Sequence, residues 1–461
     1  MKQFLSGVAE WLDSDRATYV IVGFGLILRI IPLVIVDGRF LYFENPSYYE
    51  MGLRLLRGEK FSPYWPPGVP YYLLIAHKIF GDGLFAARAS ILLIYVGFSF
   101  ALYGLAKEVS SRRAGNLATL LFAWYPTYIR SAFNPSTEYP TAACLVAAVY
   151  LAIRVIRKPS LLLSTALGIA LGSLALIRAS SLLLAVLTPL YLYRRTKRCA
   201  PALTSLLVSL VLISAWLWKA YNMTGRFVMV NDANAYNLFQ SNNAYTPLYN
   251  TCADNPVDWG VSSQFTEMAR QIETQEPGVQ QQLYRRIALH HIVSRPDLFC
   301  LRTFNRFRAY FGFPIHRGEP LTRYTSFTKM RRGLGLAVTL LDLCFYWPIV
   351  ILAITFCFNL PSFSVKTHCL VTILGVAFAY AFPYWLTCSQ PRYNFPVVPL
   401  FSVFAAMLLD SLVERSWKDI LAPVIHSVWR RRVMVLALGF FLYIQVEWIW
   451  IVLSSKVSWA R

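Results

Sequence analysis

Two carboxylates stand beside apolar runs, in places where an acid can do chemistry. Glu44 follows the first apolar run in the stretch FENPSYYEMG, and Glu138 lies in SAFNPSTEYP, between the third and fourth runs. Two carboxylates near one membrane surface can serve as a general base and as a metal ligand or second acid. The structural alternative is that each is a solvated loop residue or the cap of an interfacial helix.

Three arginines begin, interrupt or precede apolar runs. Arg88 lies in FAARAS, Arg178 in LALIRASSLL and Arg392 in SQPRYNFPVVP. Arginine at membrane depth is costly, so such residues tend to line cavities or to bind anions. Phosphate is a suitable anion because the planar guanidinium group matches its oxygens in a bidentate arrangement. The alternative is that these side chains extend to the lipid headgroups.

A third group of polar residues is the amide-rich stretch GRFVMVNDANAYNLFQSNN, residues 225–243. It contains Asn237, Asn242 and Asn243, interleaved with aromatic residues. Amide side chains hydrogen-bond to sugar hydroxyls, and aromatic rings stack on the apolar face of a sugar. Asparagine is also a common turn residue, so an ordinary loop is the alternative interpretation.

The composition indicates the kind of element that must position these groups. Of the 461 residues, 56% are hydrophobic and only 15% are charged. An average soluble domain is about 45–50% apolar and about 25% charged. The sequence therefore predicts an all-α polytopic membrane protein. Its net charge of +21 is distributed between apolar runs, as in membrane topology signals, and forms no continuous patch that would bind nucleic acid.

About eleven runs are apolar enough to be membrane spans, each needing about 20 residues. The first carries no cleavage site and is predicted to be retained. The runs lie at about 19–37, 85–106, 115–131, 139–156, 161–177, 179–193, 202–219, 334–358, 369–387, 395–413 and 433–453 by the hydropathy criterion.

Basic residues predict the orientation of these spans. Four Lys/Arg clusters, which include Arg112–Arg113 and Arg430–Arg432, fall on the same side of the membrane as the N-terminus. The positive-inside rule then places the N-terminus in the cytoplasm and the C-terminus outside. The short loops on the other side, such as 132–138 and 388–394, are almost free of Lys and Arg.

The same count predicts three parts. Residues 1–219 form an N-terminal transmembrane module with a first external loop, 38–84. Residues 220–333 form a long extracytoplasmic region, and 334–461 form a C-terminal transmembrane module. Helices are predicted in both external parts, because YRRIALHHIV has apolar residues at helical spacing and the proline-headed segment 66–80 suits an interfacial helix.

The eight cysteines and the histidines give weaker signals. The cysteines are scattered without zinc spacing; Cys252 and Cys300 fall in one external region and could pair, but the reduced, buried state is favoured for each. His77 and the pair His290–His291 are conceivable metal ligands, but their spacing does not support a site.

Taken in order, these pieces resemble the glycosyltransferase-C superfamily, and most closely its bacterial branch that is similar to protein O-mannosyltransferases and to the lipid A aminoarabinose transferase. That branch has an acid-x-x-x-Tyr pattern after the first span, followed by small, leucine and glycine positions, which here are Glu44, Tyr48, Gly52, Leu55 and Gly58. A Pro-Pro stretch, a Phe-Gly and an Ala-x-Arg follow in the family, and here these are Pro66–Pro67, Phe80–Gly81 and Ala87–Arg88.

Later parts of the chain continue the resemblance. Ser136–Glu138 is similar to the family's Ser-Glu loop, Arg178 to its Leu-x-Arg, and Gly225–Asn243 to its Gly-x-x-Val…Asn-Leu…Asn-Asn run. Its Arg-Tyr-x-x-Pro-x-x-Pro pattern matches Arg392, Tyr393, Pro396 and Pro399. Each motif is short, but the ordered set covers about residues 19–413, and such an order is hard to obtain by chance.

The resemblance implies an enzyme that moves a sugar, hexose or pentose, from a polyprenyl-phosphate carrier to an acceptor hydroxyl at the outer face, with inversion and a carboxylate base. It implies Glu44 and Glu138 as catalytic residues. The implied substrate-binding residues are Tyr48, Arg88, Arg178, Asn237, Asn242, Asn243, Arg392 and Tyr393. The acceptor class stays open between protein, lipid and glycan, and membrane lipid is the other partner. The expected location is the bacterial cytoplasmic membrane.

Two departures from the family pattern matter. The first-loop base is usually aspartate, whereas this chain has Glu44. Relatives of the lipid A enzyme carry Glu-Lys before Pro-Pro, where this chain has Tyr64–Trp65. A metal bound through that motif is therefore not expected, although a divalent metal held elsewhere stays open. Two other readings also remain: a transporter of lipid-linked saccharides, and an inactive relative that acts as a scaffold.

Overall fold

The computed structural model describes residues 2–35, 46–59, 63–81, 83–131, 136–248, 262–313, 331–363 and 365–454. Glu44 and Cys252 lie outside these ranges. The described residues form helices, turns and no strand, so the predicted all-α class is confirmed.

The helices of the first half follow one another closely. They are α1 (Lys2–Leu12), α2 (Asp15–Ile35), α3 (Pro46–Leu56), α4 (Gly68–Phe80), α5 (Leu84–Val109), α6 (Arg112–Trp124), α7 (Pro126–Arg130), α8 (Glu138–Arg157), α9 (Leu161–Ile177), α10 (Leu182–Thr196) and α11 (Cys199–Thr224). Short 3-10 turns join some of the helices, including Ala179–Ser181 (η3) between α9 and α10.

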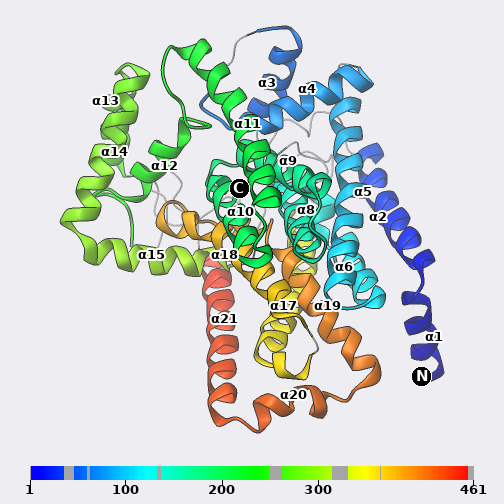
Figure 1. Cartoon of the computed structure of the whole chain (residues 1–461). Helices are drawn as coiled ribbons and strands as arrows, with labels where there is room; N and C mark the ends of the chain where they lie inside the picture. Colours follow the sequence, from blue (N-terminus) through cyan, green and yellow to red (C-terminus); the bar gives the residue numbers. More distant parts are fainter. Residues whose placement is uncertain are drawn as a thin grey trace.

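The second half begins with four helices outside the predicted spans. They are α12 (Ala233–Ser241), α13 (Ser263–Glu273), α14 (Pro277–Ser294) and α15 (Pro296–Tyr310), and they lie together at the left of Figure 1, away from α1, α2 and α5. The remaining helices are α17 (Arg331–Phe358), α18 (Thr367–Leu386), α19 (Val398–Glu414), α20 (Trp417–Ile425) and α21 (Val428–Ser454), with the turns η4 (Leu360–Ser362) and η5 (Pro391–Asn394).

Each predicted apolar run overlaps a helix, and the third run overlaps two. Within the described residues, six helices are long and apolar enough to cross a membrane: α5, α8, α11, α17, α18 and α21. The chain is therefore an integral membrane protein. The helices predicted for YRRIALHHIV and for 66–80 are confirmed as parts of α14 and α4.

Proline explains where one run departs from the prediction. The third run, 115–131, is divided into α6 and α7 because Tyr125 adopts an extended conformation (φ −67°, ψ 117°). Pro126 follows it, and the residue before a proline is disfavoured in the α region. Pro126 then stands in the first turn of α7, where its missing N–H has no cost.

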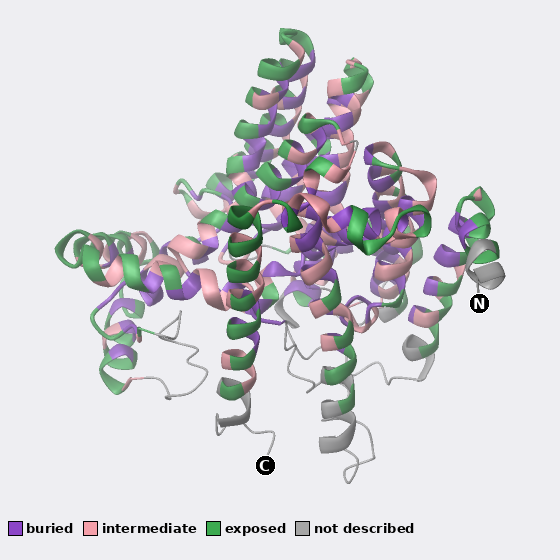
Figure 2. Cartoon of the chain, turned by 90° about the horizontal axis from the view of Figure 1, so that it is seen from below, coloured by how far each residue is buried: buried purple, intermediate pink, exposed green. Residues whose placement is uncertain are grey.

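One buried core joins the two halves of the chain. It combines α5, α6 and α8 with α17, α18 and α19. Figure 2 shows the buried residues concentrated toward the middle of the molecule. Aromatic rings fill part of it: the ring centroids of Phe98 and Phe122 are 4.2 Å apart, and those of Tyr128 and Phe395 are 4.1 Å apart. The boundaries predicted at 219 and 334 remain predictions.

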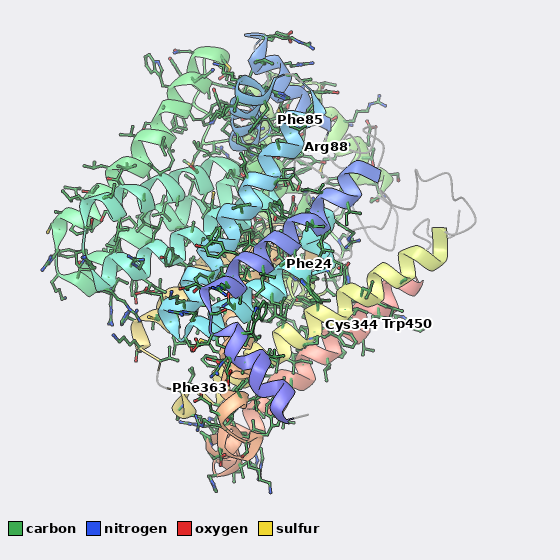
Figure 3. The ribbon with its side chains drawn as sticks, turned by 90° about the vertical axis from the view of Figure 1, so that its right-hand side faces the viewer. Phe24, Phe85, Arg88, Cys344, Phe363 and Trp450 are labelled. Carbon is green, nitrogen blue, oxygen red and sulfur yellow. The ribbon has the colours of Figure 1, made fainter. Side chains whose placement is uncertain are left out.

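The two ends of the molecule carry the loops that the sequence assigns to opposite sides of the membrane. Arg88 and Phe85, at the start of α5, lie at one end near α3 and α4, whereas Phe363, after η4, lies near the other end (Figure 3). The predicted assignment of these ends to the inside and the outside of the membrane remains a prediction.

A buried ion pair connects α7 to α17. Arg130 Nη2 pairs with Asp342 Oδ2, and the Thr127 hydroxyl donates to Asp342 Oδ1 at 2.7 Å. The side chain of Asp342 is 3% exposed. Asp342, which lies within the eighth predicted span, is thus buried and has both carboxylate oxygens bonded by side chains of α7.

Replacing Asp342 by asparagine should destabilise the protein markedly. The change leaves Arg130 without its carboxylate, and loss of one partner of a buried pair costs about 3 kcal/mol of unfolding free energy. Denaturant titration of the protein in micelles measures this. Asp15→Asn is the control, because its pair with Arg112 is exposed and is worth about 0.5 kcal/mol. Equal effects of the two changes would contradict the assignment.

Candidate functional site

A cavity of about 420 Å³ opens where segments far apart in the sequence meet. Its walls come from α3, residues 65–66, the start of α8, the junction of α9 and α10, α12, and the end of α18 with the following loop to Tyr393. We call it the arginine cavity, after Arg178 and Arg392. Its size lies in the range of small-molecule sites.

The break between α9 and α10 places Arg178 in this cavity. Arg178 is extended (φ −141°, ψ 112°) between α9 and η3, so its side chain leaves the helical register. Opposite it, Glu138 begins α8, where the positive end of the helix dipole favours a carboxylate. Arg178 Nη2 donates to Glu138 Oε1 at 2.5 Å, and both side chains are almost fully buried.

Tyrosines hold the other side of Arg178. Its Nη1 donates to the hydroxyl of Tyr384 at 3.0 Å, and Ser180 donates to the same hydroxyl at 2.8 Å. The ring of Tyr384 stacks on that of Tyr393 at 4.6 Å, and the Arg178 guanidinium lies 5.2 Å from the centre of the Tyr393 ring. Arg178 is therefore fixed in one orientation by α8 and α18.

Arg392 is held much less firmly. It lies in η5, its Nη2 is 3.5 Å from the Tyr393 hydroxyl, and it is exposed. Within the described part of the chain it forms no ion pair with a carboxylate. The charged residues that line the cavity are Glu138, Arg178 and Arg392, so the described wall has a net charge of +1. That excess sits on Arg392, because Glu138 already balances Arg178.

A close approach of two backbones brings residues 65–66 beside Arg178. Gly68, the first residue of α4, faces Ile177, and a Cβ atom there would lie 2.7 Å from the Ile177 nitrogen. Only glycine permits this contact. The Pro-Pro-Gly turn is thereby placed directly against the residue that precedes Arg178.

Tyr48 and Asn237 also line the cavity. Tyr48, on α3, is buried, and its ring centroid is 5.9 Å from that of Trp65. Burial raises the pKa of Tyr48, so its hydroxyl stays protonated and can donate a hydrogen bond. The Asn237 Oδ1 atom accepts a hydrogen bond from Gln240 at 2.8 Å, which holds this side chain on α12.

The structure brings six of the predicted site residues together: Tyr48, Glu138, Arg178, Asn237, Arg392 and Tyr393. Asn242 and Asn243 do not line this cavity, because their side-chain NH₂ groups bind the carbonyls of Leu238 and Phe239 at the end of α12. Arg88 does not line it either. The predicted base, Glu44, lies outside the described residues.

Sequence reasoning missed Ser180 and Tyr384. Tyr384 follows Pro383 near the end of the ninth apolar run, where an interfacial tyrosine is equally expected. No metal cluster of three or more His, Cys, Asp or Glu side chains occurs in the ranges that the structure describes. His291 instead bonds to Arg302 at 2.9 Å.

The cysteines correct one expectation. Cys300 is free, so it is not paired with Cys252. It is exposed, so the prediction that it is buried is wrong. Cys388, which lines the arginine cavity, is disulfide-bonded.

Thiol labelling distinguishes these two cysteines. Cys300 should react with a maleimide reagent on the native protein, whereas Cys388 should stay unlabelled until a reductant is added. Mass spectrometry of the digested protein reports both sites in one sample. Labelling of Cys388 without a reductant, at the rate seen for Cys300, would exclude the disulfide.

Comparison with known proteins finds a family that matches part of this chain and solved structures that share its fold. Residues 65–219, which include Glu138 and Arg178, match the model of a family described as dolichyl-phosphate-mannose-protein mannosyltransferase. No curated protein matches the chain. The predicted resemblance to the glycosyltransferase-C superfamily is confirmed by this family match and by the fold.

The fold is shared with the oligosaccharyltransferase of Archaeoglobus fulgidus, at 13% sequence identity and a TM-score of 0.51. The match covers 96% of this chain and 56% of that one, so the chain spans little more than half of the archaeal enzyme. A second structure, ArnT from Cupriavidus metallidurans bound to undecaprenyl phosphate, matches at 12% identity and a TM-score of 0.41, over 88% of this chain and 78% of that one.

Proposed function

We propose that the protein is a glycosyltransferase that moves a sugar from a polyprenyl-phosphate carrier to an acceptor hydroxyl. The observation that carries the proposal is the net positive charge of the described wall of the arginine cavity, where Arg392 has no carboxylate partner among the described residues. A sugar joined to a lipid by a phosphodiester carries one negative charge, which this wall complements. The name of the matched family, which refers to a dolichyl-phosphate sugar, supports the same donor class.

The two arginines have different tasks in this proposal. Arg392 binds the phosphate directly, since its guanidinium is free to form a bidentate contact. Arg178, whose charge Glu138 balances, is fixed by Glu138 and Tyr384 and acts as an oriented hydrogen-bond donor. As the sugar leaves, negative charge grows on the phosphate oxygen, and groups already positioned in a buried site stabilise that charge most effectively.

The transfer step balances as follows. The acceptor oxygen forms a bond to the anomeric carbon while the bond from that carbon to the phosphate oxygen breaks, which inverts the configuration. The acceptor proton passes to a carboxylate base, and polyprenyl phosphate leaves. Glu44 remains our proposed base. Glu138 has one oxygen engaged by Arg178 and the other 3.4 Å from the Thr137 hydroxyl, so its first task is to orient Arg178.

The outer face of the membrane is the proposed site of this reaction. The basic loops assign that side to the loop after α18, and the disulfide of Cys388, at the cavity wall, agrees with it. The branch that the motifs resemble favours a bacterial cytoplasmic membrane.

Arg392→Ala should lower kcat/KM for the donor on the order of a hundredfold, because one contact to the developing charge is lost. Arg392→Lys should recover part of it, since lysine keeps the charge but not the bidentate geometry. Release of polyprenyl phosphate from a panel of polyprenyl-phosphate sugars measures the rates. Arg270→Ala, at an exposed arginine of α13, is the control. If R392A and R270A behaved alike, Arg392 would not be the phosphate ligand.

Glu44→Gln separates the enzyme from the transporter and scaffold readings. Loss of the general base should reduce transfer at least about a hundredfold, with the fold and donor binding intact. Glu138→Gln should reduce transfer and thermal stability together, because Arg178 loses its buried partner. Unchanged saccharide export or assembly with E44Q would favour the other readings, as would no release of polyprenyl phosphate across the whole panel.

A further inference from the structure

A second cavity of about 440 Å³ lies beside the first, and we call it the tyrosine cavity. Its rings come from Tyr64, Tyr236 and Tyr284, and its charged side chains are Arg226, Asp232 and Glu273. It is formed by the end of α11, the start of α12 and the facing turns of α13 and α14. Nothing in the proposed donor chemistry uses these residues.

A thin wall separates the two cavities. Asn234 and Asn237 of α12 line the arginine cavity, whereas Tyr236 lines the tyrosine cavity from a different face of the same helix. Residues 63–65 complete the wall. The Asp232 and Ala233 N–H groups donate to the carbonyls of Pro63 and Tyr64 at 3.0 and 3.2 Å, and the side chains of Tyr64 and Trp65 lie on its two sides.

The aromatic part of the tyrosine cavity is rigid. The ring centroids of Tyr236 and Tyr284 are 5.3 Å apart in an edge-to-face arrangement, and both rings pack on the small core around Phe239. Burial and the nearby Glu273 carboxylate raise the pKa of Tyr284 to about 12, so its hydroxyl stays a hydrogen-bond donor. Such rings offer an apolar face edged by a polar group, which suits a sugar ring.

The polar part supplies acceptors and donors for hydroxyl groups. Asp232 pairs with Arg226 through two bonds, one of 2.8 Å between Nη1 and Oδ1. Gln280 donates to the carbonyls of Glu273 and Gln275 at 2.9 and 2.7 Å, which leaves its oxygen available. Gln281 also lines the cavity. Arg226, Asp232 and Glu273 sum to −1, so the described wall opposes an anionic ligand.

We infer that the tyrosine cavity binds a neutral saccharide, the carbohydrate portion of the acceptor. This inference rests on the proposed transfer reaction and selects a glycan among the open acceptor classes. The wall between the cavities is about one helix wide, about 10 Å with side chains. An acceptor of at least two sugar units can therefore lie in the tyrosine cavity and present its end to the arginine cavity.

Saturation-transfer NMR on the full-length protein in micelles tests this without any donor. The probes are methyl glycosides of glucose, galactose, mannose and N-acetylglucosamine, their disaccharides, glucuronic acid, and an uncharged serine-containing hexapeptide. The test variant is Glu273→Ala with Gln281→Ala. The matched control is Glu267→Ala with Gln282→Ala, which changes the same charge and residue types at exposed positions of the same two helices.

We expect at least one neutral glycoside to show saturation transfer that falls about fivefold or more in E273A/Q281A and stays unchanged in the control, with disaccharides giving the stronger signal. The inference is overturned if no neutral glycoside depends on the test variant, or if only glucuronic acid or the peptide does. Polyprenyl-phosphate release is measured in parallel on the same preparation. If release fails while glycoside binding depends on Glu273 and Gln281, the transfer proposal fails and the saccharide site stands.

Discussion

The ion pair between Arg178 and Glu138 is the contact on which the arginine cavity depends. Burying two charges carries a desolvation penalty, which is offset only when the geometry is good and the remaining donors are satisfied. Here Glu138 accepts from Nη2 of Arg178 and Tyr384 from Nη1, while the buried Nε has no partner among the described residues. The pair fastens the break after α9 to the start of α8 and to α18. Because it cancels its own charge, the attraction for an anion falls to Arg392.

The site is built from interruptions of helices more than from helices themselves. Arg178 is available because α9 stops before η3, Glu138 because α8 starts at its own position, and Arg392 because η5 separates α18 from α19. Helix ends carry unpaired backbone groups and partial charges, and a lipid-facing helix end would leave them unsatisfied. Gathering these ends around one cavity concentrates polar groups at a single place.

Much of the fold could be predicted from the sequence, because a bilayer demands long apolar helices and leaves little choice. Arg178 and Arg392 were found for a related reason: an arginine beside an apolar run is costly and therefore conspicuous. Tyr384 carried no such signal, since tyrosine is ordinary at a membrane interface. Asn242 and Asn243 were predicted to bind substrate and do not line the cavity. An amide side chain can hydrogen-bond to a sugar or to the backbone of its own helix, and only the structure shows that these two bond to the end of α12.

The cysteines follow the same logic. Whether a thiol is free depends on which residue lies a few ångströms away, so spacing along the chain did not reveal that Cys388 is oxidised or that Cys300 is not. The net charge of each cavity likewise depends on which distant residues the fold brings together. The arginine and tyrosine cavities share one short helix, α12, yet their described walls differ by two units of charge.

The contact between Gly68 and Ile177 limits how far the arginine cavity can narrow. Because the two backbones already touch with no side chain between them, α4 cannot move closer to the end of α9. The Pro-Pro-Gly turn therefore sets a minimum width at this edge of the cavity.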